Sequence, residues 1–124
     1  MIGCVFCDKI AAGGDEHGPV MDTADAGTVM FEPLNPITPG HMLFVPRGHM
    51  PDAAEHPWVT GKTAQVAAAY AFVMAEPFNL ITSAGTAATQ TVRHLHWHYV
   101  PRRDGDMLTL PWSRFSRVTG RLIE

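Results

Sequence analysis

Three histidines occupy alternate positions near the end of the chain: His94, His96 and His98. Side chains alternate between the two faces of a β-strand, so a strand over 93–100 would place all three imidazoles on one face. Three protonated rings in one place would repel each other, and we therefore expect some to be neutral near pH 7. The triplet alone is compatible with a metal centre that has three histidine ligands. It is equally compatible with nucleophilic attack by a histidine on phosphorus.

Two cysteines, Cys4 and Cys7, stand three positions apart. The N-terminal residues lack the basic and apolar regions of a secretory signal, and no apolar run is long enough to cross a bilayer. We therefore expect a cytoplasmic protein that does not engage membranes. In that setting the cysteine spacing favours a metal or redox pair over a structural disulfide.

Composition indicates a folded chain with a small acidic excess. The 124 residues are 46% hydrophobic and 17% charged, which predicts one domain over 1–124 and argues against disorder. A net charge of −3 disfavours a general nucleic-acid binder. Residues 93–124 nevertheless hold six of the nine Lys and Arg and only three acids, which favours an anionic ligand.

The elements that must position these residues follow from periodicity and from prolines. Apolar residues at helical spacing (Val66, Ala69, Tyr70, Val73 and Met74) predict a helix over 58–76, which Pro77 stops. The order of elements predicts an α+β fold: an antiparallel sheet of about five strands, one main helix and a short N-terminal helix. The expected strands are 19–22, 28–32, 41–46, 79–82 and 93–100, and the expected short helix is 7–12.

The residues around the triplet resemble a known family. Gln90–Arg102 resembles the signature of the histidine-triad (HIT) nucleotide hydrolases and transferases: Gln, small hydroxyl, apolar, any residue, His-x-His-x-His, two residues, Pro-Arg. Asn35–His49 resembles the family's N-P-x-x-P-G-H segment with its apolar strand and P-[KR]-x-H ending. Cys4–Ile10 resembles the zinc-bearing N-terminus of the bacterial, Hint-like branch, and Trp112 resembles a C-terminal Trp of that branch. The resemblance implies a HIT-like fold.

The resemblance also implies catalytic roles. His96 would attack the α-phosphorus of a nucleoside phosphoramidate, adenylate or dinucleoside polyphosphate, and water would cleave the resulting nucleotidyl-histidine. His98 would donate a hydrogen bond to the phosphate or leaving group, while Gln90 and Thr91 would contact phosphate oxygens. The nucleophilic nitrogen must stay unprotonated, so the other ring nitrogen of His96 needs an acceptor such as a backbone carbonyl.

A nucleotide site, with a purine nucleoside phosphate as ligand, follows from the same resemblance. This chain departs from the family at two positions of that site: Pro33 stands where a ribose-binding Asp is common, and Ser83 where Asn is common. Glu32 is the neighbouring carboxylate that would have to substitute for the Asp. The residues expected to bind the nucleotide are His41, Asn35, Leu34, Ser83 and Trp112.

Two further features are implied by the resemblance. Cys4, Cys7, His49 and His94 would form a tetrahedral Cys2His2 site for a structural zinc ion. The chain would pair into a homodimer through its main helix, where Ala67, Ala68 and Ala71 would permit close approach. Two alternatives to the enzyme remain open: a nucleotide-binding or interaction module with little catalysis, and a His-ligated metalloenzyme.

Overall fold

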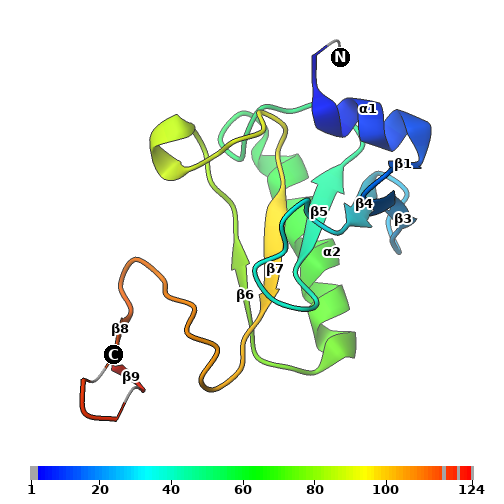
Figure 1. Cartoon of the computed structure of the whole chain (residues 1–124). Helices are drawn as coiled ribbons and strands as arrows, with labels where there is room; N and C mark the ends of the chain where they lie inside the picture. Colours follow the sequence, from blue (N-terminus) through cyan, green and yellow to red (C-terminus); the bar gives the residue numbers. More distant parts are fainter. Residues whose placement is uncertain (1–2, 116, 120, 124) are drawn as a thin grey trace.

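The computed structural model describes residues 3–115, 117–119 and 121–123. Its centre is a five-stranded antiparallel sheet in the order β3-β4-β5-β7-β6 (Figure 1). The α+β prediction is therefore confirmed. The sheet strands are β3 Met21–Asp22, β4 Thr28–Phe31, β5 Met42–Pro46, β6 Phe78–Ile81 and β7 Trp97–Pro101. The other elements are α1 Val5–Ala12, β1 Gly14–Asp15, β2 Gly18–Pro19, α2 Pro57–Met74, the 3-10 turn η1 Thr86–Ala88, β8 Arg114–Phe115 and β9 Leu122–Ile123.

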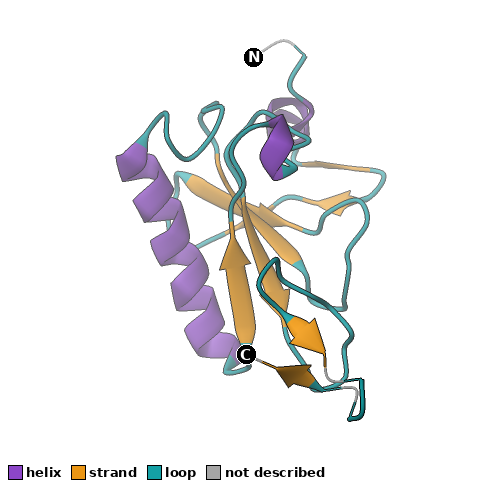
Figure 2. Cartoon of the chain, turned by 90° about the vertical axis from the view of Figure 1, so that its left-hand side faces the viewer, coloured by secondary structure: helices purple, strands orange, loops and turns teal. Residues whose placement is uncertain are grey.

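The central strand β5 is buried on both faces, which explains its unbroken apolar sequence. Because side chains alternate, Met42 and Phe44 pack with Tyr99 under α2, which covers one face of the sheet (Figure 2). Leu43 and Val45 point to the other face and belong to a second cluster, against which α1 packs. The fold thus brings α1 to the side of the sheet that carries the histidines.

The main helix begins and ends close to the expected residues, and two of its apolar residues at helical spacing, Val66 and Tyr70, pack partly buried against the core. Pro57 occupies the first turn, and Ala75 closes the helix in the left-handed conformation at φ 53°. The side chain of Val73 is 78% exposed, whereas Ala67 and Ala71 are buried against the chain's own sheet. Two of the three alanines expected to pair with a second copy therefore face the core, and only Ala68 lies outside.

The strand that carries the triplet is shorter than predicted, because β7 begins at Trp97 rather than Arg93. Pairing with β5 stops at Trp97 opposite Phe44. Beyond that point Pro46 has no N–H to donate, and its carbonyl is bound by the His94 side chain at 2.8 Å. His94 and His96 thus lie in the loop that precedes the strand.

The chain after Pro101 leaves the sheet and runs away from it toward β8 and β9 (Figure 1). Arg102 anchors the start of this segment through Asn79, Asp106 and the carbonyl of Leu108. The Arg102 guanidinium is therefore bound within the fold. Among the described residues, no helix has both the length and the apolarity that crossing a membrane requires.

Candidate active site and metal centre

His96 is held by a backbone carbonyl of its own loop. Its Nδ1 lies 2.7 Å from the carbonyl oxygen of His94, and the residue is only 8% exposed. A carbonyl can only accept a hydrogen bond, so Nδ1 carries the proton and Nε2 carries a lone pair. This is the acceptor that the sequence could not identify. Burial lowers the pKa of His96, which keeps the ring neutral near pH 7.

The His98 ring has the opposite tautomer to that of His96. The backbone N–H of Ile37 donates to His41 Nδ1 at 3.2 Å, so the neutral His41 ring carries its proton on Nε2. That Nε2 lies 2.9 Å from His98 Nδ1, which must therefore accept. The remaining nitrogen of His98, Nε2, consequently carries a proton. Burial, together with the neighbouring His96 and His41, lowers the pKa of His98 to about 4.

The two rings line one cavity of about 420 Å³, with centroids 5.1 Å apart. A ring with a lone pair and a ring with an N–H donor thus stand side by side at its edge. Of the expected site residues, the cavity is also lined by Thr91, Leu34 and Asn35. His41 lies behind His98 and acts on the cavity through that ring.

Other expected site residues lie elsewhere. The Gln90 side chain is buried and its amide is bound to backbone: Oε1 accepts from Gly85 N, and Nε2 donates to the carbonyls of Pro51 and Val92. Gln90 thus ties its own loop, between β6 and β7, to the loop that carries Pro51. Within the described part of the chain, Ser83 and Trp112 do not line the 420 Å³ cavity, and Trp112 is 73% exposed.

Several lining residues were not anticipated from the sequence. Val5, Phe6 and Lys9 reach the cavity from α1, and Phe31 reaches it from the end of β4, beside the expected Glu32. Phe6 makes edge contacts with the rings of both His94 and His96, at centroid distances of 6.0 and 5.1 Å. The cysteine pair was the one available signal, because whatever holds Cys4 and Cys7 near His94 also brings α1 to the triad.

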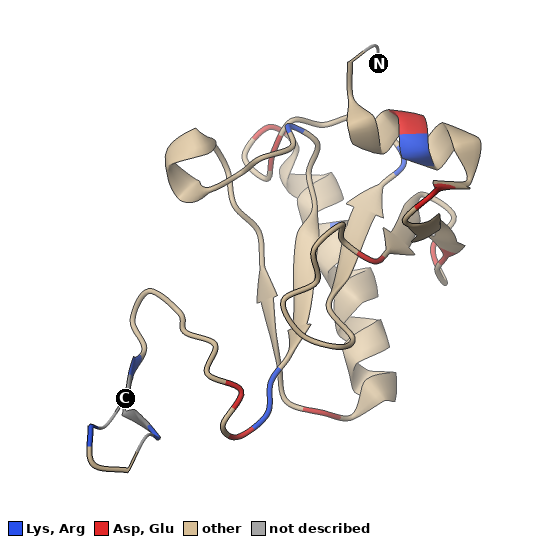
Figure 3. Ribbon diagram, viewed as in Figure 1, with Lys and Arg blue, Asp and Glu red and all other residues tan. Residues whose placement is uncertain are grey.

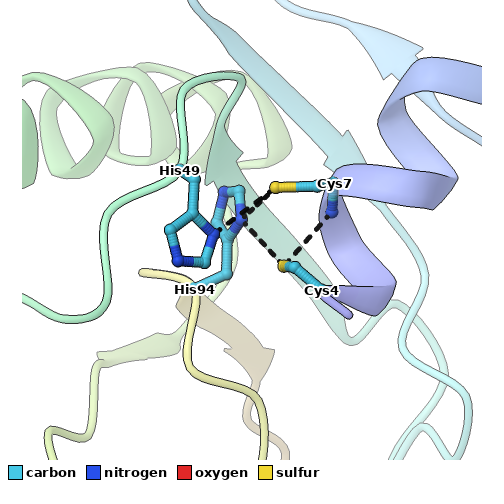
Figure 4. A group of neighbouring side chains, drawn as sticks. All are labelled: Cys4, Cys7, His49 and His94. Carbon is cyan, nitrogen blue, oxygen red and sulfur yellow. Dashed lines mark hydrogen bonds between the residues drawn. The ribbon is translucent and has the colours of Figure 1, made fainter. Parts of the chain in front are cut away.

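Four side chains meet at the N-terminus of α1: Cys4, Cys7, His49 and His94 (Figure 4). His94 therefore turns away from His96 and His98, so the three imidazoles do not converge on one volume as their spacing predicts. The ligand atoms of the two cysteines, His49 and His94 all lie within 4.8 Å of one another, and this cluster of four is able to hold a metal ion.

The dimensions of this cluster suit a small tetrahedral ion. The measured Sγ···Nδ1 separations are 3.5 Å for Cys4–His94, 3.4 Å for Cys7–His49 and 3.5 Å for Cys7–His94. Metal–sulfur and metal–nitrogen bonds of zinc, about 2.3 and 2.0–2.1 Å, give a tetrahedron edge of roughly 3.5 Å. His94 Nε2 donates to the Pro46 carbonyl, which leaves Nδ1 unprotonated for a metal.

Comparison with known proteins identifies the family. A family model described as the HIT domain matches residues 23–105, which is more than half of the chain. The chain belongs to the HIT family. An uncharacterized HIT-like protein of Mycobacterium tuberculosis is 31% identical over 97% of this chain and 90% of its own length.

Solved HIT structures share this fold. A HIT family hydrolase from Clostridium thermocellum is 26% identical, with a TM-score of 0.73 over 90% of this chain and 98% of its own. A zinc-bound histidine triad family protein from Mycobacterium smegmatis is 29% identical, with a TM-score of 0.69 over 88% of this chain and 81% of its own. The HIT-like fold and the relationship to a zinc-bearing member expected from the motifs are thereby confirmed.

Proposed function

We propose that this HIT protein hydrolyses nucleotides at the α-phosphorus, with His96 as nucleophile. The observation that supports this most strongly is the pairing of opposite ring tautomers at the cavity edge. The carbonyl of His94 fixes the lone pair on Nε2 of His96, and His41 fixes the proton on Nε2 of His98. A nucleophile and a hydrogen-bond donor are what displacement at phosphorus requires.

The reaction would proceed in two displacements. In the first, Nε2 of His96 forms a bond to phosphorus while the bond to the leaving nitrogen or oxygen breaks, and that atom takes a proton from solvent, to which the second displacement returns one. The His94 carbonyl stabilises the positive charge that develops on the ring, and the His98 N–H stabilises negative charge on the phosphate. In the second, water attacks phosphorus, loses a proton and releases His96, so that one water yields a nucleoside monophosphate and the free leaving group.

Polar groups of the cavity fit the rest of a nucleotide. Glu32 and Asn35 line the cavity together with the apolar residues and the histidines. Although Pro33 lacks a carboxylate, Glu32 offers acceptors for ribose hydroxyls from the next position. Thr91 stands on the triad side, where its hydroxyl suits a phosphate oxygen.

A substrate panel tests this function. Purified protein is incubated with an adenosine phosphoramidate, an aminoacyl-adenylate and a dinucleoside polyphosphate, and the products are separated. We expect a nucleoside monophosphate from at least one substrate, because attack at the α-phosphorus leaves that phosphate on the nucleoside. A protein that binds these ligands but releases no monophosphate is a binding module, and the proposal is then wrong.

We further propose that the Cys2His2 cluster holds a structural zinc ion. Four protein ligands fill a tetrahedral site and leave no position for water, so the ion would brace α1 against the triad loop rather than activate a reactant. The tautomers disfavour the His-ligated metalloenzyme, because Nε2 of His98 carries a proton and of these two rings only His96 offers the cavity a lone pair. The zinc-bound relative supports this choice of metal.

A homodimer is proposed through the outer face of α2 and the edge strand β6. Phe72 and Val73 are 86% and 78% exposed on this face, beside Ala68, and β6 is the last strand of the sheet. Large exposed apolar side chains and an unpaired strand edge both favour a covering partner. A second copy of the chain would cover both the apolar side chains and the strand edge with the same surface.

Light scattering at micromolar concentration should give twice the single-chain mass of 13.5 kDa. Ala68→Glu should yield monomers, because it buries a charge at the centre of the interface. Ala11→Glu, at an exposed alanine of α1, is the matched control and should remain dimeric. A parent mass of 13.5 kDa would reject the dimer, and a dimeric Ala68→Glu would reject this surface.

A further inference from the structure

The far end of the triad cavity carries a buried charge that the mechanism above does not use. The Lys9 side chain is only 8% exposed, and its Nζ lies 3.1 Å from Asp15 Oδ1. The same ammonium stands 4.7 Å from the centroid of the Phe31 ring. In Figure 3, basic and acidic residues meet where α1 lies above β1. Lys9, Asp15 and Phe31 all line the cavity.

Aromatic rings connect this charge to the nucleophile. The His96 ring lies 5.1 Å from that of Phe6, which lies 5.2 Å from that of Phe31, over which Lys9 is placed. Val5 and Leu43 complete the apolar wall. A nucleotide whose phosphate reaches His96 would therefore lay its base along these rings, with the outer edge of the base at Lys9.

The Lys9–Asp15 pair could serve only to fasten α1 to β1. A buried ammonium is costly, however, and an aliphatic side chain would pack the same wall without that cost. Lys9 has three N–H donors, and in the described part of the chain Asp15 is its one hydrogen-bonding partner. Donors therefore remain for a group in the cavity.

We propose that Lys9 makes the site selective for guanine over adenine nucleotides, an inference that rests on the proposed nucleotide hydrolysis. Guanine presents two acceptors, O6 and N7, on one edge, and a lysine donates to both. Adenine presents an N6 amino donor beside N7, which opposes an ammonium. Asp15 is the positioning residue: it holds Nζ in the cavity, while its own pKa is lowered by the His17 backbone N–H and by Lys9.

The test measures binding of three monophosphates to the intact protein by calorimetry. GMP should bind at least about fivefold more tightly than AMP, the lower end of what one such base contact discriminates. IMP should bind as GMP does, because it keeps O6 and N7 and lacks only the 2-amino group. AMP binding equal to or tighter than GMP would overturn the inference, and so would IMP binding as weakly as AMP.

Two lysine-to-methionine variants test whether Lys9 causes the guanine preference. Lys9→Met keeps an unbranched side chain but removes the donors, and should reduce the GMP to AMP ratio to about one. Lys62→Met, a half-exposed lysine of α2 outside this cavity, should keep the parent ratio. A Lys9→Met protein that retains its melting temperature and the guanine preference would show that Lys9 does not read the base.

The ligand series needs no variant, so a Lys9→Met chain that fails to fold leaves the inference testable. Failure of the proposed nucleotide hydrolysis would give different binding results from failure of the guanine preference alone. If none of the three nucleotides binds, the nucleotide site itself is refuted. If they bind equally while the substrate panel still yields monophosphates, hydrolysis stands and only the guanine preference falls.

Discussion

Replacement of His96 by alanine should abolish turnover while nucleotide binding persists. The substitution removes the nucleophile but leaves the apolar wall of Phe6 and Phe31 intact. We expect kcat to fall by at least about 10⁴-fold, the scale seen when a nucleophile is removed from a catalytic unit. The measurement pairs steady-state kinetics on the best substrate of the panel with calorimetric binding of the monophosphate product.

His56→Ala is the matched control, because His56 is exposed and its side chain makes no capping hydrogen bond to α2. It should retain parent activity. If His96→Ala keeps turnover within about tenfold of the parent, the barrier has changed by only ~1.4 kcal/mol. That is too little for a lost nucleophile, and water would then have to attack phosphorus directly.

Replacement of Cys7 by serine should release the metal and destabilise the protein. Elemental analysis of protein prepared without chelators should find about one zinc per chain in the parent and none in the variant. A loss of ~3 kcal/mol would lower the melting temperature by roughly 10 °C in a chain of this size. The proposed ion would tie α1 to His49 and His94, and its loss would remove that tie.

A chelator separates a structural ion from a catalytic one. It should lower the melting temperature of the parent to that of Cys7→Ser and should not shift the variant further. Activity measured well below the melting temperature should largely survive chelation, since no step uses the ion. Zinc-free parent protein would reject the site, and reversible loss of all activity in a fully folded protein would favour the metalloenzyme.

The sequence predicted the architecture well because its strong signals are local. The buried run at β5, the prolines that bound it and the long apolar helix all follow from composition over short windows. The candidate metal ligands and His41 required the family resemblance, since they are distant in sequence. Four of these side chains, Cys4, Cys7, His49 and His94, do lie together.

The remaining features depend on tertiary contacts. The strand at the triad begins late because Pro46 cannot donate and binds His94 instead, a pairing that no periodicity reveals. The outward position of Val73 could not be predicted from helical spacing, because this helix is apolar on nearly every side. Gln90 is bound to backbone groups of its own loop and also to the carbonyl of Pro51 in another loop, a contact that only the folded chain assembles.

The stereochemistry at phosphorus tests the central claim, covalent catalysis by His96, most directly. A substrate with a chiral α-phosphorothioate is hydrolysed in isotopically labelled water, and the configuration of the product is determined. Each in-line displacement inverts phosphorus, so two displacements through a nucleotidyl-histidine should give net retention. Net inversion would mean a single displacement by water, and it would contradict the role assigned to His96.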